Sequence, residues 1–293
     1  MKKLLLAASA MSLAAGAAVA EDVKIGTLLG ITGPIESIAP NMFAAVDLAM
    51  KEVNDSGKAA NGWVFQSVRA DSTCIDAAAA TAAAERLITV EGVKGIIGGD
   101  CSGVTRAVLT NLAMPNGMVM ISPSATSPAL TTDPDDGLFF RTVPSDAREG
   151  VVMADILEAR GVKSIALTYS NSDYGKGLAE AIANAFTAKG GTVTINASHD
   201  DGKADYSAEV GALAAAGGDV LVVAGYIDQG GKGIIQAAVD SGAFTTFGLP
   251  GGMYGESLVA AIGAPLNGSF GQHASSTSDG YAVLTSDDPA ADT

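Results

Sequence analysis

The chain has 293 residues, of which 17 are basic and 32 are acidic, and its formal net charge is −15. This length is enough for two ordinary domains. Such an acidic chain is repelled by phosphate backbones and anionic lipid head groups, so the composition argues against nucleic-acid binding.

The first twenty residues have the pattern of a secretory signal peptide. A basic pair, Lys2 and Lys3, precedes an apolar stretch and an A-x-A cleavage site at 18–20. The apolar stretch is too short to cross about 30 Å of hydrocarbon, and no later segment has the ~18 uninterrupted apolar residues of a transmembrane helix. We therefore expect residues 1–20 to be removed and the remaining chain to be soluble and periplasmic.

From residue 23 onward, short apolar runs alternate with stretches of helical periodicity. In this first part the expected strands are 23–29, 64–68, 93–97 and 118–121, and the expected helices are 41–53, 76–90 and 104–113. Strands separated by helices of this length indicate βαβ units and a parallel sheet covered on both faces.

The alternation restarts after an extended link at 139–144, where Pro144 disfavours helix at the preceding residue. Beyond the link, the expected strands are 163–169, 192–196, 219–224 and 244–249, and the expected helices are 146–159, 174–188, 207–216, 229–241 and 254–262. The polar stretch "HDDGKADYS" reads as a loop.

The fold class predicted from this order is α/β, with two doubly wound parallel-sheet lobes joined by an extended hinge. We expect an N-terminal lobe over 21–142 and a C-terminal lobe over 143–271. Residues 272–293 are small, polar and acidic, without a helix or strand period, and are expected to form an atypical tail.

The cysteines and histidines bear on metal binding. Cys74 and Cys101 are the only cysteines, and in an exported chain they suggest one disulfide. A metal site is the competing use, but the only histidines, His199 and His273, are not at metal-ligand spacing. We expect both histidines to be solvated, and we expect no metal and no cofactor.

Two loops at strand ends of the N-terminal lobe carry the candidate binding groups. Ligands of open parallel sheets bind beyond the carboxyl ends of the strands. In "GIIGGDCSGVT" a helix begins near Ser102, whose hydroxyl and N–H groups can receive a carboxylate. In "MISPSATSPALT", Ser124, Ala125 and Thr126 offer neutral donors and acceptors. Such residues ordinarily form turns and caps, but two loops at one expected crevice favour a small polar ligand.

Catalytic motifs are absent from the sequence. There is no G-x-S-x-G nucleophile turn, no Gly-Lys-Ser/Thr of a P-loop, and no G-x-G-x-x-G spacing. We expect the protein not to be an enzyme.

Several stretches together resemble the leucine/isoleucine/valine-binding proteins of ABC transporters, which are type I periplasmic binding proteins. The stretches are "GTLLGITGPIES", "ADSTCIDAAAATAAAERL", "GDCSGVTRAV", "MISPSATSPALT", "FFRTVPSD", "YSNSDYGKGLAEA" and "DGKADYSAEV". The resemblance runs from about Val23 to Gly271. It implies two doubly wound lobes, three hinge crossings, closure around one small ligand, a disulfide matching Cys74 to Cys101, and an inner-membrane ABC permease as partner of a monomeric receptor.

The resemblance also assigns roles to residues of this chain. Ser102 matches the serine that receives the ligand carboxylate, and Thr126 matches the threonine that touches both carboxylate and ammonium. Ser124 matches the residue whose carbonyl accepts from the ammonium. Tyr174 and Tyr226 match the second-lobe tyrosines that reach the ligand when the lobes close.

Two departures from the family qualify this assignment. The family usually pairs the ligand ammonium with an acid after the strand near 244–249, where this chain has Gly251 and Gly252. Either Glu36 or Asp228 substitutes, with Glu36 the preferred hypothesis, or the ligand has no ammonium. A solvated loop acid is an equally good interpretation of Glu36.

The second departure is length, because family members continue past residue 271 with elements that complete the first lobe. The chain is therefore expected to be a fragment or to have an incomplete first lobe. On these grounds the expected function is a periplasmic receptor that binds a small aliphatic, branched-chain amino acid and delivers it to a permease. The alternatives are a receptor for amine-free carboxylates, such as keto or aromatic acids, and a ligand-sensing regulator.

Overall fold

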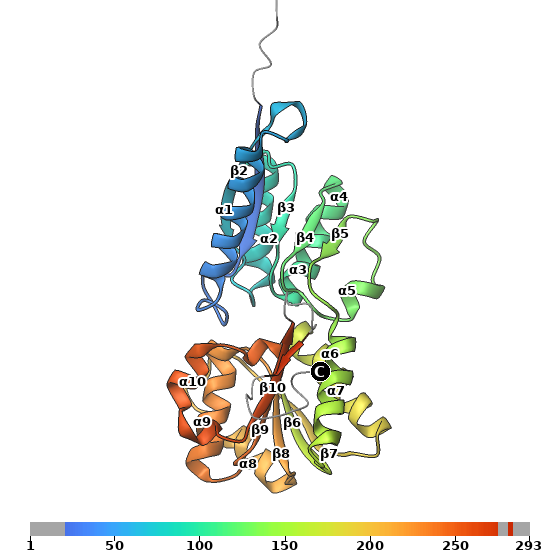
Figure 1. The fold of residues 1–293 in the computed structure, drawn as a ribbon, viewed down its shortest axis with the longest axis vertical. Coiled ribbons are helices and arrows are strands. Elements are labelled where there is room, and N and C mark those ends of the chain that lie inside the picture. The colour runs from blue at the N-terminus through green and yellow to red at the C-terminus, as the bar shows by residue number, and fades with distance from the viewer. Residues whose placement is uncertain (1–20, 275–280, 284–293) are drawn as a thin grey trace, which may run out of the picture.

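The computed structural model describes residues 21–274 and 281–283, which form two α/β lobes, each built on one sheet (Figure 1). The N-terminal sheet has the order β2-β1-β3-β4-β5 and is parallel throughout. Its strands are β1 (Asp22–Leu29), β2 (Val64–Asp71), β3 (Ile96–Gly98), β4 (Met120–Ser122) and β5 (Phe139–Arg141).

The C-terminal sheet has the order β11-β10-β9-β8-β6-β7 and is parallel except for the β10–β11 pair. Its strands are β6 (Ser164–Ser170), β7 (Thr192–His199), β8 (Val220–Ala224), β9 (Phe247–Leu249), β10 (Phe270–Ala274) and β11 (Tyr281–Val283). The predicted class, two parallel-sheet α/β lobes, is confirmed.

The predicted helices are present, with ends shifted by a few residues. The N-terminal lobe has α1 (Ala39–Ser56), α2 (Ala77–Arg86), α3 (Ser102–Val108), α4 (Met114–Asn116) and α5 (Ala129–Thr132). The C-terminal lobe has α6 (Asp146–Ala159), α7 (Asp173–Ala188), α8 (Ser207–Ala216), α9 (Lys232–Ser241) and α10 (Glu256–Ile262). Wider π-type turns, Leu87–Glu91 and Leu109–Ala113, extend α2 and α3, and a third, Ile227–Gly231, precedes α9.

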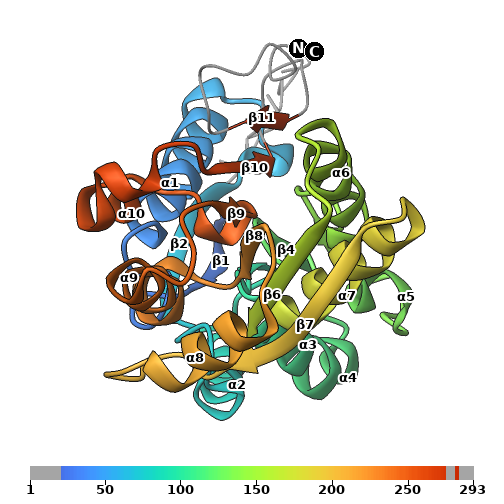
Figure 2. The same cartoon turned by 90° about the horizontal axis from the view of Figure 1, so that it is seen from below.

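The C-terminal sheet is covered on both faces, with α6 and α7 on one side and α8 and α9 on the other (Figure 2). Every residue of β8 is buried. Val222 packs in one apolar cluster with Leu178 of α7, while Val223 packs in a second cluster with Ile234 of α9. Each fully buried side chain of this kind contributes about 1.5–3 kcal/mol to folding.

The N-terminal sheet is covered unevenly. One face buries Leu28, Ile96 and Met120 in a cluster with α2 and α3. On the other face α1 covers the β1–β2 end, while Ile121 is 40% and Phe140 55% exposed in neighbouring strands. Within the described residues, cover on both faces is therefore complete only in the C-terminal lobe.

The chain passes from the first sheet to the second through residues 142–145, the one crossing in the part of the chain that the structure describes. Ser145 then caps α6, because its Oγ accepts from the N–H of Ala147 at 3.3 Å. The disulfide between Cys74 and Cys101 is present, with their Cα atoms 5.1 Å apart.

The structure corrects two expectations. Residues 272–274 end β10, and residues 281–283 form β11, which pairs antiparallel with it in the C-terminal sheet, so the prediction of a tail without strands is wrong in both segments. His199 is not solvated: it ends β7, is 1% exposed, and its Nδ1 lies 2.8 Å from Oγ1 of Thr168. Burial lowers the pKa of His199 to about 4.

The predicted signal peptide at 1–20 and the tail at 275–280 and 284–293 lie outside the described residues. Among the residues that are described, no helix is long and apolar enough to span a bilayer.

Candidate functional site

The two predicted loops of the N-terminal lobe meet at the carboxyl ends of β3 and β4. Ser102 begins α3 and is 1% exposed, and its Oγ accepts from the N–H of Ser127 at 3.1 Å. The Oγ of Ser124 donates to the carbonyl of Asp100 at 2.8 Å. The two loops are therefore joined by two hydrogen bonds. In each of them a side-chain hydroxyl of one loop bonds to a backbone group of the other.

Asp100 is a residue that the sequence analysis did not single out. Its side chain is 2% exposed and accepts from the N–H of Gly30, from Oγ of Ser72 at 2.7 Å and from the N–H of Cys101 at 3.0 Å. Burial raises its pKa, although these donors oppose the rise. Asp100 thus ties together the segments that follow β1, β2 and β3 and positions Ser102. Its place directly after a strand, in "GGDCSG", is the signal that could have identified it.

The loop after β4 contains one hydroxyl that is buried without a hydrogen-bond partner. The N–H of Ala125 donates to Oγ of Ser122 at 2.9 Å, and Ala125 is fully buried. The carbonyl of Thr126 accepts from the N–H of Asp146 at 2.9 Å, which connects this loop to α6 of the other lobe. The Oγ1 of Thr126 is buried without a hydrogen-bond partner.

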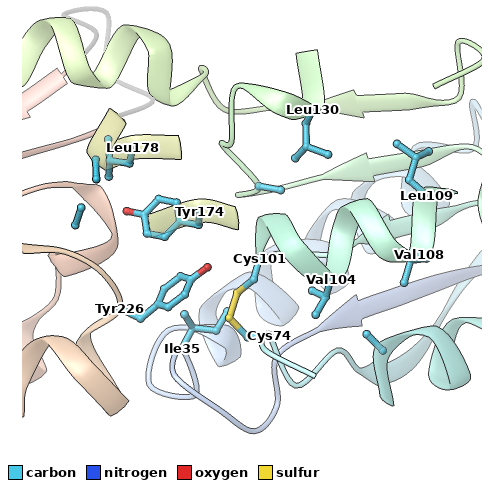
Figure 3. Packing of buried hydrophobic residues seen from close by; sticks show 14 of the residues in the cluster. Ile35, Cys74, Cys101, Val104, Val108, Leu109, Leu130, Tyr174, Leu178 and Tyr226 are labelled. Atoms are coloured by element: carbon cyan, nitrogen blue, oxygen red, sulfur yellow. A yellow bond between two sulfur atoms is a disulfide. The ribbon is translucent and has the colours of Figure 1, made fainter. Parts of the chain in front are cut away.

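The two predicted tyrosines lie together on the C-terminal lobe. Tyr174 is in the first turn of α7 and Tyr226 follows β8, and their rings stack with centroids 4.9 Å apart. Burial raises the pKa of both hydroxyls well above the ordinary value, so both are neutral. Tyr226 points toward Ile35 and the disulfide of the other lobe, while the hydroxyl of Tyr174 points away from them, toward the segment after β9 (Figure 3).

The glycine pair after β9 is part of this arrangement. The N–H of Gly252 donates to the hydroxyl of Tyr174 at 2.9 Å. A Cβ at Gly252 would lie 2.5 Å from that hydroxyl oxygen, so a larger residue would displace the ring. The absence of a side chain at 252 is therefore a condition for the observed position of Tyr174.

The lobes contact each other across the cleft. Ser37, in the loop after β1, donates from its N–H and its Oγ to Asp228, the latter at 2.6 Å. Asp228 also pairs with Lys232 at 2.9 Å. Asp228 is thus already engaged by Ser37 of one lobe and Lys232 of the other. Glu36 is exposed next to Ser37, and its role at the ligand stays a prediction.

A cavity of about 440 Å³ opens between the lobes beside the tyrosines. The N-terminal lobe contributes Cys74 and Gly103 to its lining, and the C-terminal lobe contributes Ser172, Asp201 and Tyr226. Of the predicted ligand residues, Tyr226 alone lines this cavity. Ser124 and Thr126 lie outside its lining.

An acidic pair on α6 lies near the segment that follows β9. Oε1 of Glu149 accepts from the N–H of Gly251 at 2.6 Å, and the Glu149 carbonyl accepts from Nε2 of Gln272 at 2.7 Å. Asp146, one turn earlier, is fully buried. Burial raises the pKa of both carboxyl groups, and the charge of Glu149 adds to the rise at Asp146. The pair was missed because its contact lies 102 positions away in the sequence.

Two α/β lobes with a cavity between them, lined by residues of both, have the architecture of a two-lobe ligand-binding protein. The comparisons identify the family. The periplasmic binding protein family matches residues 22–286, so this chain belongs to that family, in its type I Leu/Ile/Val-binding branch.

Relatives of the chain are binding proteins. It is 29% identical over 252 residues to the Leu/Ile/Val-binding protein of Escherichia coli K12, covering 86% of this chain and 67% of the relative. The structure is similar to the branched-chain amino acid transporter substrate-binding protein LivJ of Streptococcus pneumoniae in complex with isoleucine. That match has a TM-score of 0.76 and 25% identity, and covers 88% of this chain and 72% of LivJ.

A third similar structure holds a different ligand. It is an ABC transporter solute-binding protein of Rhodopseudomonas palustris in complex with 4-hydroxybenzoate, with a TM-score of 0.76 and 21% identity. The match covers 86% of this chain and 68% of that protein. At this identity the likeness shows a shared fold. One fold therefore accommodates an amino acid in one relative and an aromatic acid in another.

Proposed function

We propose that this protein is the substrate-binding component of an ABC transporter, that it binds a small aliphatic, branched-chain amino acid between its lobes, and that it delivers the ligand to an inner-membrane permease. One observation carries the proposal: a cavity lies between the lobes, and its lining includes Gly103, which follows Ser102 in one lobe, and Tyr226 of the other. The predicted serine, threonine and tyrosine side chains supply neutral donors and acceptors, which suit reversible binding.

The proposed mechanism is hinge closure. In the open form, the loops that hold Ser102, Ser124, Ala125 and Thr126 receive the carboxylate and ammonium of the ligand. A ligand that also contacts the two tyrosines favours the closed population, because only the closed form makes both sets of contacts. The Ser37–Asp228 bonds across the cleft add to the closed form.

The setting of this function is also proposed. Residues 1–20 direct export, residues 21–142 and 143–271 form the two lobes, and the protein acts as a periplasmic monomer. The names of the relatives support a receptor rather than an enzyme.

A second candidate is a receptor for amine-free acids. The observation that favours it is the glycine pair 251–252 at the place where the family usually has an acid. Without a carboxylate partner, a buried ammonium would lose a charge-assisted contact of about 1.5–3 kcal/mol.

Calorimetric titration of the purified protein with L-leucine and with its keto acid, 4-methyl-2-oxopentanoate, separates these candidates. The two ligands share a tail and a carboxylate and differ at the ammonium. We expect leucine to bind more tightly. Preference for the keto acid would move the protein to the amine-free class, and binding of neither would contradict the proposed ligand class.

A further inference from the structure

The place where the family carries an acid is filled from another element of this chain. A side chain at Gly251 would begin at a Cβ 3.3 Å from Oε1 of Glu149, and the N–H of Gly251 donates to that same oxygen. The Glu149 carboxylate, which comes from α6, therefore occupies the space that a side chain at position 251 would enter. Gly150, the next residue, allows α6 to pack closely against α7, because a Cβ at position 150 would lie 2.5 Å from the backbone of Ala181.

Asp146 places a second carboxyl group beside Glu149. Both of its carboxylate oxygens are buried and accept no hydrogen bond from an N–H or hydroxyl group, although the neighbouring Glu149 carboxyl group can share a proton with them. The hydroxyl of Thr126 is close enough to lower the pKa of Asp146, but it is not in hydrogen-bond geometry. Buried acceptors without donors cost free energy. A positively charged donor that entered beside Thr126 would satisfy them.

The side chains around Asp146 and Glu149 do not supply enough positive charge to balance two ionised carboxylates. The charged and titratable side chains that act on Asp146 and Glu149 are Arg141 of β5, Tyr174 of α7 and Tyr226 after β8. The tyrosines are neutral, and the Arg141 guanidinium already donates to two backbone carbonyls of the first lobe. Two buried neighbouring carboxyl groups hold a shared proton until another cation replaces it.

We propose that Glu149, with Asp146 beside it, is the anionic partner of the ligand ammonium in place of an acid at position 251, and that amino-acid binding releases the proton shared by the free pair. This inference rests on the proposed function and narrows its ligand class to amino acids. In the free protein a proton neutralises one carboxyl group. In the complex the ammonium neutralises it, and the proton passes to solvent. A keto acid brings no positive charge and leaves the proton in place.

The substitution Glu149→Gln tests the charge and keeps the contact, because the amide oxygen can still accept from the N–H of Gly251. We expect leucine affinity to fall roughly 10- to 100-fold, while keto-acid affinity changes less than about 2-fold. The matched control is Glu158→Gln, an exposed acid on the same helix that pairs with Lys189 at 2.6 Å. It should leave both affinities unchanged.

Returning the acid to position 251 should rescue binding. Gly251 is not in the left-handed region, so a side chain there is compatible with the backbone. The double variant Glu149→Ala/Gly251→Glu should recover most of the leucine affinity that Glu149→Ala loses, because alanine frees the space beside position 251. Titrations in two buffers of different ionisation enthalpy should show proton release with leucine in the wild type, and none with the keto acid or in Glu149→Gln.

The outcomes separate this inference from the proposed function. If Glu149→Gln bound leucine as tightly as the wild type, the inference would be overturned and the receptor function would stand. If the wild type bound the keto acid but not leucine, both the inference and the amino-acid ligand would fail. Thermal unfolding shows whether Glu149→Gln is folded, and if it is not, Asp146→Asn provides the same test with the same expected losses.

Discussion

The two lobes share a topology but are stabilised in different ways. In the C-terminal lobe, β8 is buried on both faces by two separate apolar clusters. In the N-terminal lobe, α1 and β1–β4 line an apolar groove of about 300 Å³, and Ile121 and Phe140 are substantially exposed. The lobe that supplies most of the proposed ligand groups is the one with less apolar cover among the described residues.

In the N-terminal lobe, a disulfide and buried hydrogen bonds compensate for the less complete apolar cover of the sheet. The Cys74–Cys101 disulfide joins the segment after β2 to the segment after β3, and Asp100 joins these to the segment after β1. Such links fix the loop geometry without a two-sided core. The comparison teaches that the precision of the binding loops and the stability of the fold have different sources in this molecule.

The largest expected effect is in the two-sided core. Leu167→Ala removes a fully buried side chain of β6 and should lower the free energy of unfolding by about 2–5 kcal/mol, because it leaves a cavity in a closely packed core. Urea unfolding followed by circular dichroism measures the loss. Ile121→Ala, on the open face of β4, is the matched control and should cost less than about 1 kcal/mol. Equal losses would contradict the difference between the lobes.

Removing the disulfide should be the next largest effect. Replacing Cys74 and Cys101 by alanine should lower the free energy of unfolding by about 3 kcal/mol, since the closed loop no longer restricts the unfolded chain. Calorimetry should place this loss in the transition of the N-terminal lobe and leave the C-terminal transition in place. A shift confined to the C-terminal transition would show that the disulfide does not support the loops as described.

The smallest expected effect is the pH dependence of the C-terminal lobe. Burial lowers the pKa of His199 to about 4 in the folded protein. As the pH drops below about 6.5, the histidine is protonated in the unfolded chain but not in the folded protein, so the free energy of unfolding decreases. From about pH 7 to about pH 5 the loss is about 2 kcal/mol. Asp201 opposes it: burial raises its pKa to about 6, so the folded chain binds that proton first and gains about 1 kcal/mol over the same range.

Two variants separate these contributions. In Asp201→Asn the loss of stability between about pH 7 and about pH 5 should approach about 2 kcal/mol, and in His199→Asn its sign should reverse. Chemical unfolding at each pH measures both. An unchanged pH dependence in His199→Asn would show that this histidine is not the titrating group.

Strand ends show how far sequence patterns reach. The predicted strands 93–97 and 244–249 begin before β3 and β9, because Val93 and Phe244 are buried without joining the hydrogen-bonded ladder. A run of apolar residues indicates which residues are buried. Here the buried residues include some that precede the hydrogen-bonded part of the strand. In β11 the reverse holds: small and polar neighbours in the sequence hide a segment that pairs antiparallel with β10.

The sequence by itself determined the alternation of strands and helices, the pairing of the two cysteines, and the loops that carry Ser102 and Thr126, because these depend on local periodicity, residue type and recognisable motifs. Only the tertiary structure decided that Glu149 fills the space beside Gly251 and that His199 is buried. Both follow from contacts between segments far apart in the chain, and such contacts leave no period or spacing in the sequence.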